Sequence, residues 1–373
     1  MPTPLEFQAA GLYDPDEHAD VGRLELLTWL DEQGFTIEEM QVGLVTDALG
    51  AMAGDRRLVP GERLDRGTAI SRSALAPDDF DRYVTAFGFA PIQGSPEGEV
   101  GFTEAEIAAL NAVGVLASMF SPEAATGLMR VLGSALGRIA EAAVSLFLAD
   151  VESPHLLSGS NEDVLAHKVY EAVGLVDGLA MHLDPILRRQ MLQAIERTRR
   201  TTIGMTDRFQ YRYAIGFVDL VGFTALSQNM DAPELASFLG TFEGRAHDVA
   251  TQEGARVVKL IGDEVMFVAT DASAACRAGR ALIDAFSDVG DGVLPRGGMA
   301  YGNVVLRGGD YYGPVVNLAS RLVDEAVPLE MLVTEDLVEA APSCVFMPAG
   351  RRMVKGFPEP ITVLSIGPDD RRC

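Results

Sequence analysis

Two short apolar runs, each ending at an aspartate beside a glycine, constrain the fold of this chain more than any other feature. They are Phe217-Val-Asp-Leu-Val-Gly-Phe-Thr224 and Lys259-Leu-Ile-Gly-Asp-Glu-Val-Met266. Their β-branched and aliphatic residues are typical of buried strands, and a neighbouring glycine lets backbone approach a ligand closely. Asp219 and Asp263 therefore end two predicted strands. Two such carboxylates suit Mg²⁺, which proteins usually hold through one or two carboxylates and substrate phosphates, so a nucleotide site is our first hypothesis.

The elements predicted around these runs follow one another in the order of a ferredoxin-like α+β domain. After Thr206-Asp207 the pattern predicts a strand over 213–220, a helix over 231–252, paired strands over 256–260 and 264–268, a helix over 272–286 and a strand over 299–306. This β-α-β-β-α-β order is the ferredoxin-like arrangement, with Gly262 and Asp263 at the tip of its hairpin. Because the first strand then lies beside the hairpin, Asp219 and Asp263 can share one site.

The residues before about position 200 are predicted to form an all-α bundle. Capping boxes at Thr36-Ile-Glu-Glu39 and Thr103-Glu-Ala-Glu106 mark two helix starts, and Ser121-Pro122 supplies an N-cap followed by a proline at the first helical position. The most apolar windows, 108–120 and 139–149, are too short or too closely flanked by charges to span a membrane. We expect them to be buried core helices, and we expect no transmembrane segment.

A helix predicted to begin near Asp184 joins the two halves of the chain. Its apolar stripe contains Ile186, Leu187, Met191, Leu192 and Ile195, and its arginines are Arg188, Arg189, Arg197, Arg199 and Arg200. Two interpretations stay open. The arginines dock onto the acidic second half and transmit a regulatory state, or they form a solvated helix surface.

The net charge of −24, from 54 acidic and 30 basic residues, argues against binding of nucleic acid or of an anionic membrane through bulk electrostatics. Cys276, Cys344 and Cys373 are odd in number and lack paired spacing, so neither a disulfide framework nor a zinc site is expected. The first residues, Met1-Pro-Thr-Pro, have neither the basic nor the apolar region of a secretory signal. We therefore expect a cytoplasmic protein.

A third segment, Gly309-Asp-Tyr-Tyr-Gly-Pro-Val-Val-Asn-Leu-Ala-Ser-Arg321, adds polar groups suited to a nucleotide. Gly313-Pro314 predicts a turn, after which the spacing becomes helical and places Asn317 and Arg321 at i and i+4 on one face. An amide and a guanidinium presented together suit a ribose or a phosphate, because arginine donates to phosphate oxygens with fixed geometry.

Together and in this order, the three segments resemble the motif blocks of class III nucleotidyl cyclases, over about residues 208–367. The resemblance implies that Asp219 and Asp263 bind two Mg²⁺ or Mn²⁺ ions with help from the backbone carbonyl of Leu220. It also implies that Asn317 orients the ribose and that Arg321 stabilises charge on the α-phosphate as pyrophosphate leaves. Family members build this site at a dimer interface, so the resemblance implies a homodimer.

The segments resemble adenylyl cyclases in particular, through a lysine and an aspartate at the positions that address the adenine edge. These residues are Lys259 and Asp310. Lysine can donate to adenine N1 and a carboxylate can accept from the exocyclic amine, whereas guanine has a carbonyl in place of that amine. Lys355, in Val-Lys-Gly-Phe, resembles the family's lysine for the terminal phosphates. The implied reaction converts ATP to 3′,5′-cyclic AMP and pyrophosphate.

The helical half resembles the regulatory domain of soluble actinobacterial adenylyl cyclases in its size, its helical character and its Leu26-Leu-Thr-Trp-Leu30 start. This implies a helical regulatory domain over 1–183, a linker or switch helix over 184–207 and a catalytic domain over 208–373. Members of that group respond to pH or bind lipids, so a fatty acid or another small ligand is an implied partner. The histidines that could titrate near neutral pH are His18, His155, His167, His182 and His247.

Two other functions stay open. A guanylyl or diguanylate cyclase would share the fold, but Ile261-Gly-Asp-Glu-Val265 lacks the Gly-Gly-Asp-Glu pattern of diguanylate cyclases, in which Asn317 and Arg321 would have no role. A degenerate cyclase acting only as a ligand-binding regulatory module would be expected to lack a metal aspartate or the pair of Asn317 and Arg321. This chain has all of these residues.

Overall fold

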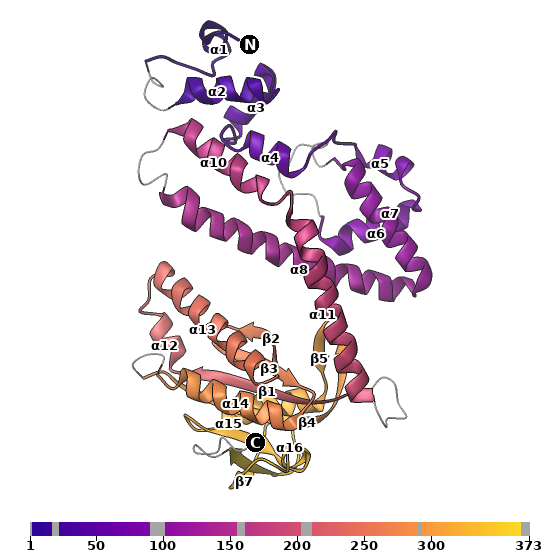
Figure 1. The fold of residues 1–373 in the computed structure, drawn as a ribbon, viewed down its shortest axis with the longest axis vertical. Coiled ribbons are helices and arrows are strands. Elements are labelled where there is room, and N and C mark those ends of the chain that lie inside the picture. Colours follow the sequence, from indigo (N-terminus) through magenta and orange to yellow (C-terminus); the bar gives the residue numbers. More distant parts are fainter. Residues whose placement is uncertain are drawn as a thin grey trace. The chain divides into compact units, whose positions relative to one another are not determined.

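The structure, a computed structural model, describes residues 2–16, 22–89, 101–154, 161–202, 211–288 and 292–366. The chain divides into two compact units, Met1–Arg188 and Arg189–Cys373. Figure 1 shows the helices of the first unit and the sheet of the second. His18, His155, Cys373 and the domain boundary expected at 207 lie outside the described residues.

The described part of the first unit is helical. Its elements are α1 (Pro4–Ala9), α2 (Arg23–Glu32), α3 (Ile37–Val45), α4 (Met52–Leu58), α5 (Arg66–Arg72), α6 (Pro77–Phe87), α7 (Glu104–Met119), α8 (Pro122–Phe147), a turn of π-helix (Leu148–Glu152), α10 (Glu162–Gly174) and the beginning of α11 (Leu179–Thr202). An isolated bridge between Leu64 and Phe102 is the only strand-like pairing described in this unit.

Several helices of this unit begin where side chains satisfy the first backbone N–H groups. The Thr36 hydroxyl at the start of α3 accepts from the backbone N–H of Glu39, whose carboxylate accepts from the Thr36 N–H in return. Thr103 begins α7 with the same arrangement, and Ser121 caps α8 ahead of Pro122. These three starts lie at the predicted positions.

Two separate apolar clusters stabilise the first unit. One is centred on Leu26, Leu27 and Leu30 of α2. The other joins α6, α7 and α8 through residues such as Phe80 and Leu110. Full burial of one such side chain contributes about 1.5–3 kcal/mol, so each cluster can hold its own group of helices.

Helix α8 is more exposed than the sequence analysis expects. With the π-helical turn it runs over Pro122–Glu152, and among the described residues it is the one helix long and apolar enough to cross a membrane by length and composition. Its buried residues are confined to the first turns, whereas Leu136, Ile139 and Leu146 are exposed. The expectation of a buried helix over 139–149 is therefore wrong, because α6 and α7 cover only the beginning of α8. The expectation of no transmembrane segment stays a prediction. The 108–120 window does bury Leu110 and Val113.

Helix α11 begins earlier than predicted. It spans Leu179–Thr202 with Pro185 in its interior, so the predicted start near Asp184 is wrong. An interior proline removes one backbone hydrogen bond, which is why proline usually marks a helix start. Here Leu179, Met181 and Leu183 are strong helix formers, and they continue the helix on the N-terminal side of the proline.

The second unit is a sheet covered by helices. Its elements are β1 (Tyr211–Val221), α12 (Phe223–Ser227), α13 (Ala232–Gln252), β2 (Arg256–Ile261), β3 (Glu264–Ala269), α14 (Ala272–Phe286), β4 (Leu294–Arg307), β5 (Asp310–Tyr312), α15 (Pro314–Glu325), β6 (Met331–Thr334), α16 (Glu335–Ala340), β7 (Phe346–Arg352) and β8 (Ile361–Ile366). The strand order is β2-β3-β1-β4-β6-β8-β7, with β5 paired to β4. β4 and β6 are parallel, and the other described pairs are antiparallel.

The strands β2-β3-β1-β4 have the order that a β-α-β-β-α-β chain forms. The helices predicted over 231–252 and 272–286 agree with α13 and α14, which begin after the capping side chains of Asp231 and Asp271. The strands β5 to β8 and α16 are missing from the prediction. These elements are short, and the strands among them show little alternation of apolar and polar residues.

The two faces of the sheet carry different helices. α13, α14 and α16 pack on one face around Phe242 and Leu282, and α15 packs with β5 on the other face around Ile215. Gly298 of β4 allows a close approach of α15, because a Cβ at this position would lie 2.5 Å from the carbonyl oxygen of Ala319. Helix α15 is therefore fixed against the central strands.

The cysteines differ from the sequence expectation at one position. Cys276 of α14 is free and buried, but Cys344 is disulfide-bonded. The expectation of no disulfide is wrong for Cys344. Pairing depends on how close two thiols come in the fold, and spacing along the sequence does not give that distance.

Candidate active site

Asp219 and Asp263 come to the same end of the sheet. β1 and β3 are antiparallel with Val218 opposite Val265, so the next residues along this register are Asp219 and Glu264. Ile261 pairs with Glu264, which leaves Gly262-Asp263 as the two-residue tip of the β2–β3 hairpin. The strand prediction placed both aspartates here, and it did not single out Glu264.

The carboxylates at this end of the sheet are close enough to perturb one another. Burial raises the pKa of Asp263, and the negative charge of Asp219 raises it further. Burial also raises the pKa of Glu264 to about 7, with contributions from the charges of Asp219, Asp324 and Asp263. Such a cluster favours a bound cation, because a positive charge relieves the repulsion between the carboxylates.

Arg296 of β4 supplies a positive charge within this cluster. Its Nε and Nη2 each donate to Asp219 Oδ2 at 3.2 Å, and the two residues are register partners on β4 and β1. Arg296 Nη1 also donates to the backbone carbonyl of Asp324 at 3.4 Å. Arg296 was not predicted from the sequence, because only the register of β1 against β4 shows that it faces Asp219.

The oxygen donors at this end of the sheet fit a divalent cation that a substrate helps to hold. Among the described residues, no group of three or more His, Cys, Asp or Glu side chains is arranged to hold a metal ion by itself. Asp219 and Asp263 offer two carboxylates, and Leu220 follows Asp219 on β1 with a backbone carbonyl. A set of this kind, completed by phosphate oxygens, suits Mg²⁺ or Mn²⁺.

Lys259 and Asp310 form a direct ion pair. Lys259 Nζ donates to Asp310 Oδ2 at 2.5 Å, with side-chain exposures of 39% and 23%. The other carboxylate oxygen, Asp310 Oδ1, accepts from the backbone N–H of Tyr311 at 2.8 Å. The pair joins β2 to β5, and the exposure of both side chains leaves them open to a ligand.

Helix α15 presents Asn317 and Arg321 at its surface. Gly313 precedes the helix with φ +138°, a conformation that favours glycine, and Pro314 takes the first helical position. Both Asn317 and Arg321 are exposed. Arg321 Nη1 lies 3.6 Å from Asp324 Oδ2, so part of the guanidinium charge is already balanced within the helix.

In one chain the predicted site residues fall into two groups. The described residues contain no direct hydrogen bond or ion pair between Asp219 or Asp263 and the second group, which is Lys259, Asp310, Asn317 and Arg321. Asp324 contacts residues near both groups, because its carbonyl accepts from Arg296 and its carboxylate lies near Arg321. Lys355 is exposed between β7 and β8, and no described hydrogen bond joins it to either group.

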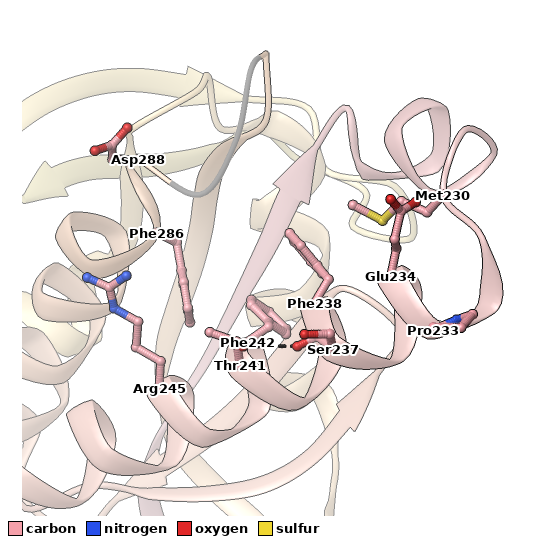
Figure 2. Close-up of a pocket in the computed structure, with 10 residues that line it drawn as sticks. All are labelled: Met230, Pro233, Glu234, Ser237, Phe238, Thr241, Phe242, Arg245, Phe286 and Asp288. Carbon is pink, nitrogen blue, oxygen red and sulfur yellow. Dashed lines mark hydrogen bonds between the residues drawn. The ribbon is translucent and has the colours of Figure 1, made fainter. Parts of the chain in front are cut away.

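A groove of about 800 Å³ lies away from all of these residues. Figure 2 shows Phe238, Phe242 and Phe286 between α13 and α14, with Arg245 and Glu234 also among the residues that line the groove. Since α13 and α14 cover the face of the sheet opposite α15, this groove is separate from the candidate site.

Comparisons with known proteins extend over both units of the chain. No family model matches it. An uncharacterised protein of Mycobacterium tuberculosis is 32% identical over 371 residues, which are 98% of this chain and 94% of that protein. A Streptomyces coelicolor protein named adenylate cyclase is 33% identical over 297 residues, which are 77% of this chain and 73% of that protein. A solved adenylyl cyclase from P. aeruginosa is 24% identical with a TM-score of 0.41, covering 44% of this chain and 97% of its own.

Proposed function

This chain belongs to the class III adenylate cyclase family, and we propose that it converts ATP to 3′,5′-cyclic AMP and pyrophosphate at a site completed by a second copy of the chain. The observation that supports ATP most is the ion pair of Lys259 and Asp310. A lysine donor beside a carboxylate acceptor matches adenine N1 and its exocyclic amine, whereas the guanine carbonyl would meet the carboxylate.

The proposed reaction is an in-line attack of the ribose 3′ oxygen on the α-phosphorus. The bond between these atoms forms, the bond from the α-phosphorus to the bridging oxygen breaks, and pyrophosphate leaves while the hydroxyl proton passes to solvent. Asn317 orients the ribose, and Arg321 donates to the α-phosphate oxygens as negative charge builds up. Lys355 binds the terminal phosphates. The exposure of Asn317 and Arg321 on α15 supports these roles.

Asp219, Asp263 and the carbonyl of Leu220 are the proposed donors for two Mg²⁺ or Mn²⁺ ions. Such ions, when bound, lower the pKa of an attacking hydroxyl and neutralise a leaving phosphate. Burial, with a smaller contribution from the charge of Asp219, raises the pKa of Asp263. This supports the assignment, because a bound cation would favour the charged carboxylate there. In the absence of another cation, Arg296 balances the charge of Asp219.

The homodimer is proposed from the division of the site residues into two groups. One chain would supply Asp219 and Asp263, and its partner would supply Lys259, Asp310, Asn317 and Arg321. Because each chain carries both groups, a two-fold dimer has two equivalent sites. A monomer would then be inactive.

Regulation by the first half of the chain is also part of this proposal. We assign residues 1–183 to a helical regulatory domain, 184–207 to a switch helix and 208–373 to the catalytic domain. The signal would be pH or a lipid. Among the described histidines, His167 and His182 of the first half are candidates for sensing pH, and His247 lies on α13 of the catalytic domain. Cyclic AMP production by the full chain and by a chain starting near Thr206, across pH and with added fatty acid, tests this. Equal activity under every condition would rule out regulation.

A cytoplasmic location is proposed because ATP, the substrate, is a cytoplasmic nucleotide. The disulfide at Cys344 opposes a reducing compartment, where thiols are kept reduced. Free thiols can be blocked at the moment of lysis and the Cys344 peptide then examined by mass spectrometry. This decides between a reducing and a non-reducing compartment. A blocked Cys344 thiol agrees with a cytoplasmic protein, and a protected disulfide argues against one.

The proposed reaction is tested with the purified full-length chain, Mn²⁺ and ATP, followed by chromatography of the products. Cyclic AMP and pyrophosphate are expected from the wild type, and neither from Asp263→Asn. Asp336→Asn, an exposed carboxylate in the first turn of α16, is the matched control and should retain full activity. Cyclic AMP synthesis by Asp263→Asn would refute the metal assignment. Failure of the wild type to consume ATP would favour the degenerate regulatory module.

A further inference from the structure

A part-buried hydrogen bond ties the ion pair of Lys259 and Asp310 to the beginning of β2. Arg256, on the same strand as Lys259, donates through Nη2 to the Tyr311 hydroxyl at 3.0 Å. Its guanidinium carbon lies 5.7 Å from the centre of the Tyr311 ring. Tyr311 directly follows Asp310 on β5. Arg256 therefore holds β5 against β2 from a position beside the ion pair.

Tyr311 is buried against β1. Its side chain is 4% exposed and packs edge-on against Tyr213 of β1, with ring centres 5.0 Å apart. The backbone N–H of Tyr311 donates to Asp310 Oδ1, while Asp310 Oδ2 accepts from Lys259. Arg256, Tyr311, Asp310 and Lys259 thus form a closed loop of contacts between β2 and β5. A shift of the Arg256 guanidinium moves Tyr311, and with it the Asp310 carboxylate.

Arg256 also lines a small cavity that α11 helps to form. The cavity has a volume of about 180 Å³ and lies wholly within the second unit, between α11 and the ends of β1, β2 and β3. Its lining includes Gln193, Glu196 and Arg197 of α11 together with Arg256. Glu196 is the one carboxylate among the lining residues that the structure describes.

Arg256 has an unused hydrogen-bond donor here. Its Nε is buried and has no hydrogen-bond partner among the described residues. A buried N–H without a partner destabilises the arrangement that contains it, and for a charged group the cost is larger. An acceptor on α11 would remove this cost and would fix the orientation of the guanidinium, because the arginine fork is planar.

We propose that Arg256 is a positioning residue for the ion pair of Lys259 and Asp310, and that Glu196 of α11 controls it by accepting a hydrogen bond from Arg256 Nε. With Glu196 engaged, the guanidinium is held on Tyr311 and the ion pair is set for adenine. Arg256 already donates to Tyr311 while its Nε lacks a partner. The bond to Glu196 fixes the guanidinium further, so displacement of α11 lowers the selectivity for adenine. This inference rests on the proposed function only in taking Lys259 and Asp310 as the groups that bind the base.

The test uses full-length variants that change one contact each. Tyr311→Phe removes the hydroxyl and keeps the ring, Arg256→Gln removes the guanidinium, and Glu196→Ala removes the acceptor on α11. Arg212→Gln is the matched control, because Arg212 is an exposed arginine of β1 that lies over Tyr301 instead. Two readouts are needed: KM and kcat for ATP and GTP with Mn²⁺, and dissociation constants for both nucleotides in EDTA.

Tyr311→Phe and Arg256→Gln are expected to weaken ATP binding and lower the preference for ATP over GTP by about tenfold, the effect of one buried hydrogen bond. Their kcat with saturating ATP should stay within about twofold. Glu196→Ala should shift selectivity in the same direction by about threefold. Arg256→Lys should fall between Arg256→Gln and the wild type, since it keeps a donor for Tyr311 but has no Nε. Arg212→Gln should bind like the wild type.

Unchanged nucleotide selectivity in Tyr311→Phe and Arg256→Gln, with only a lower melting temperature, would make Arg256 purely structural and overturn the inference. Wild-type selectivity in Glu196→Ala would also overturn it, because α11 then does not act on Arg256. If the wild type forms no cyclic AMP but Arg256→Gln still loses selective ATP binding, the proposed reaction fails and the inference stands. If the wild type forms cyclic AMP and Lys259→Ala alone changes selectivity, the inference fails and the reaction stands.

Discussion

Arg296 binds the Asp219 carboxylate from the neighbouring strand, with Nε and Nη2 each 3.2 Å from Oδ2. Both side chains are about three-quarters buried, at 25% and 22% exposure. Asp263 and Glu264 lie in the same cluster, and their pKa values are raised by burial and by the charge of Asp219. The arginine therefore stabilises a group of carboxylates that would otherwise repel one another.

Removal of this arginine should make stability depend on a divalent cation. Arg296→Gln leaves Asp219 unpaired, which costs about 1–3 kcal/mol and lowers the melting temperature by roughly 2–10 °C in EDTA. Added Mn²⁺ should restore much of the loss, because it can neutralise the same carboxylate. Differential scanning fluorimetry measures both effects.

The control for this prediction is Arg66→Gln, which breaks the exposed ion pair of Arg66 and Asp81. It should change the melting temperature little and show no response to Mn²⁺ beyond that of the wild type, since exposed pairs contribute about 0–1 kcal/mol. Identical melting of Arg296→Gln in EDTA and in Mn²⁺ would contradict a cation site at Asp219.

Arg321→Ala should lower kcat far more than it raises KM. The proposed contact with the α-phosphate strengthens as charge builds up, so its loss is felt mainly in the transition state. We expect a loss of about 10²–10³ in kcat, similar to the loss of one oxyanion donor. Steady-state kinetics with ATP measure this. Arg245→Ala, in the groove on the other face of the sheet, is the control. A change confined to KM would show that Arg321 only binds substrate.

Lys259 and Asp310 should act as one unit in a double-mutant cycle. Because their side chains are 2.5 Å apart, removing either one also misplaces the other. We expect Lys259→Ala and Asp310→Ala each to lower kcat/KM for ATP by about 10–100-fold, the effect of a hydrogen bond to a charged group. The double variant should have a kcat/KM only slightly below that of the less active single variant. Multiplicative losses would mean that the two residues contact ATP independently.

Cys276 should be unreactive in the folded protein. Burial, with a contribution from the charge of Asp271, raises the pKa of its thiol to about 12, so almost no thiolate is present at pH 8. Iodoacetamide at pH 8 should leave Cys276 unmodified in buffer and should alkylate it after unfolding in guanidinium. Mass spectrometry of the Cys276 peptide gives the answer, and rapid alkylation of the native protein would show that the α14 core opens.

The elements nearest Asp219 and Asp263 could be predicted because their signals are local. The Gly262-Asp263 tip sits between two apolar strands, and the capping aspartates Asp231 and Asp271 mark the starts of α13 and α14. Arg296 could not be predicted, because its partner is set by the register of two strands far apart in the sequence. The same holds for Arg256 and Tyr311, whose contact depends on how β5 lies against β2.

Apolar composition also misled the prediction in the first half. Residues 139–149 have the composition of a core helix, yet α8 continues past the helices that cover its beginning. An apolar composition indicates that a segment can be buried. Whether the segment is buried depends on the elements that pack against it. Pro185 misled the prediction in a similar way, because its usual position at a helix start was outweighed by the strong helix formers before it.

The central claim is that one chain supplies the metal carboxylates while its partner supplies the other site residues. The direct measurement mixes two inactive variants, Asp219→Asn and Arg321→Ala, carrying different affinity tags, and assays heterodimers recovered through both tags. Each heterodimer has one intact site and one doubly altered site, so it should form cyclic AMP at about half the wild-type rate. Heterodimers as inactive as the parent variants would contradict the account, because all of the site residues would then have to come from one chain.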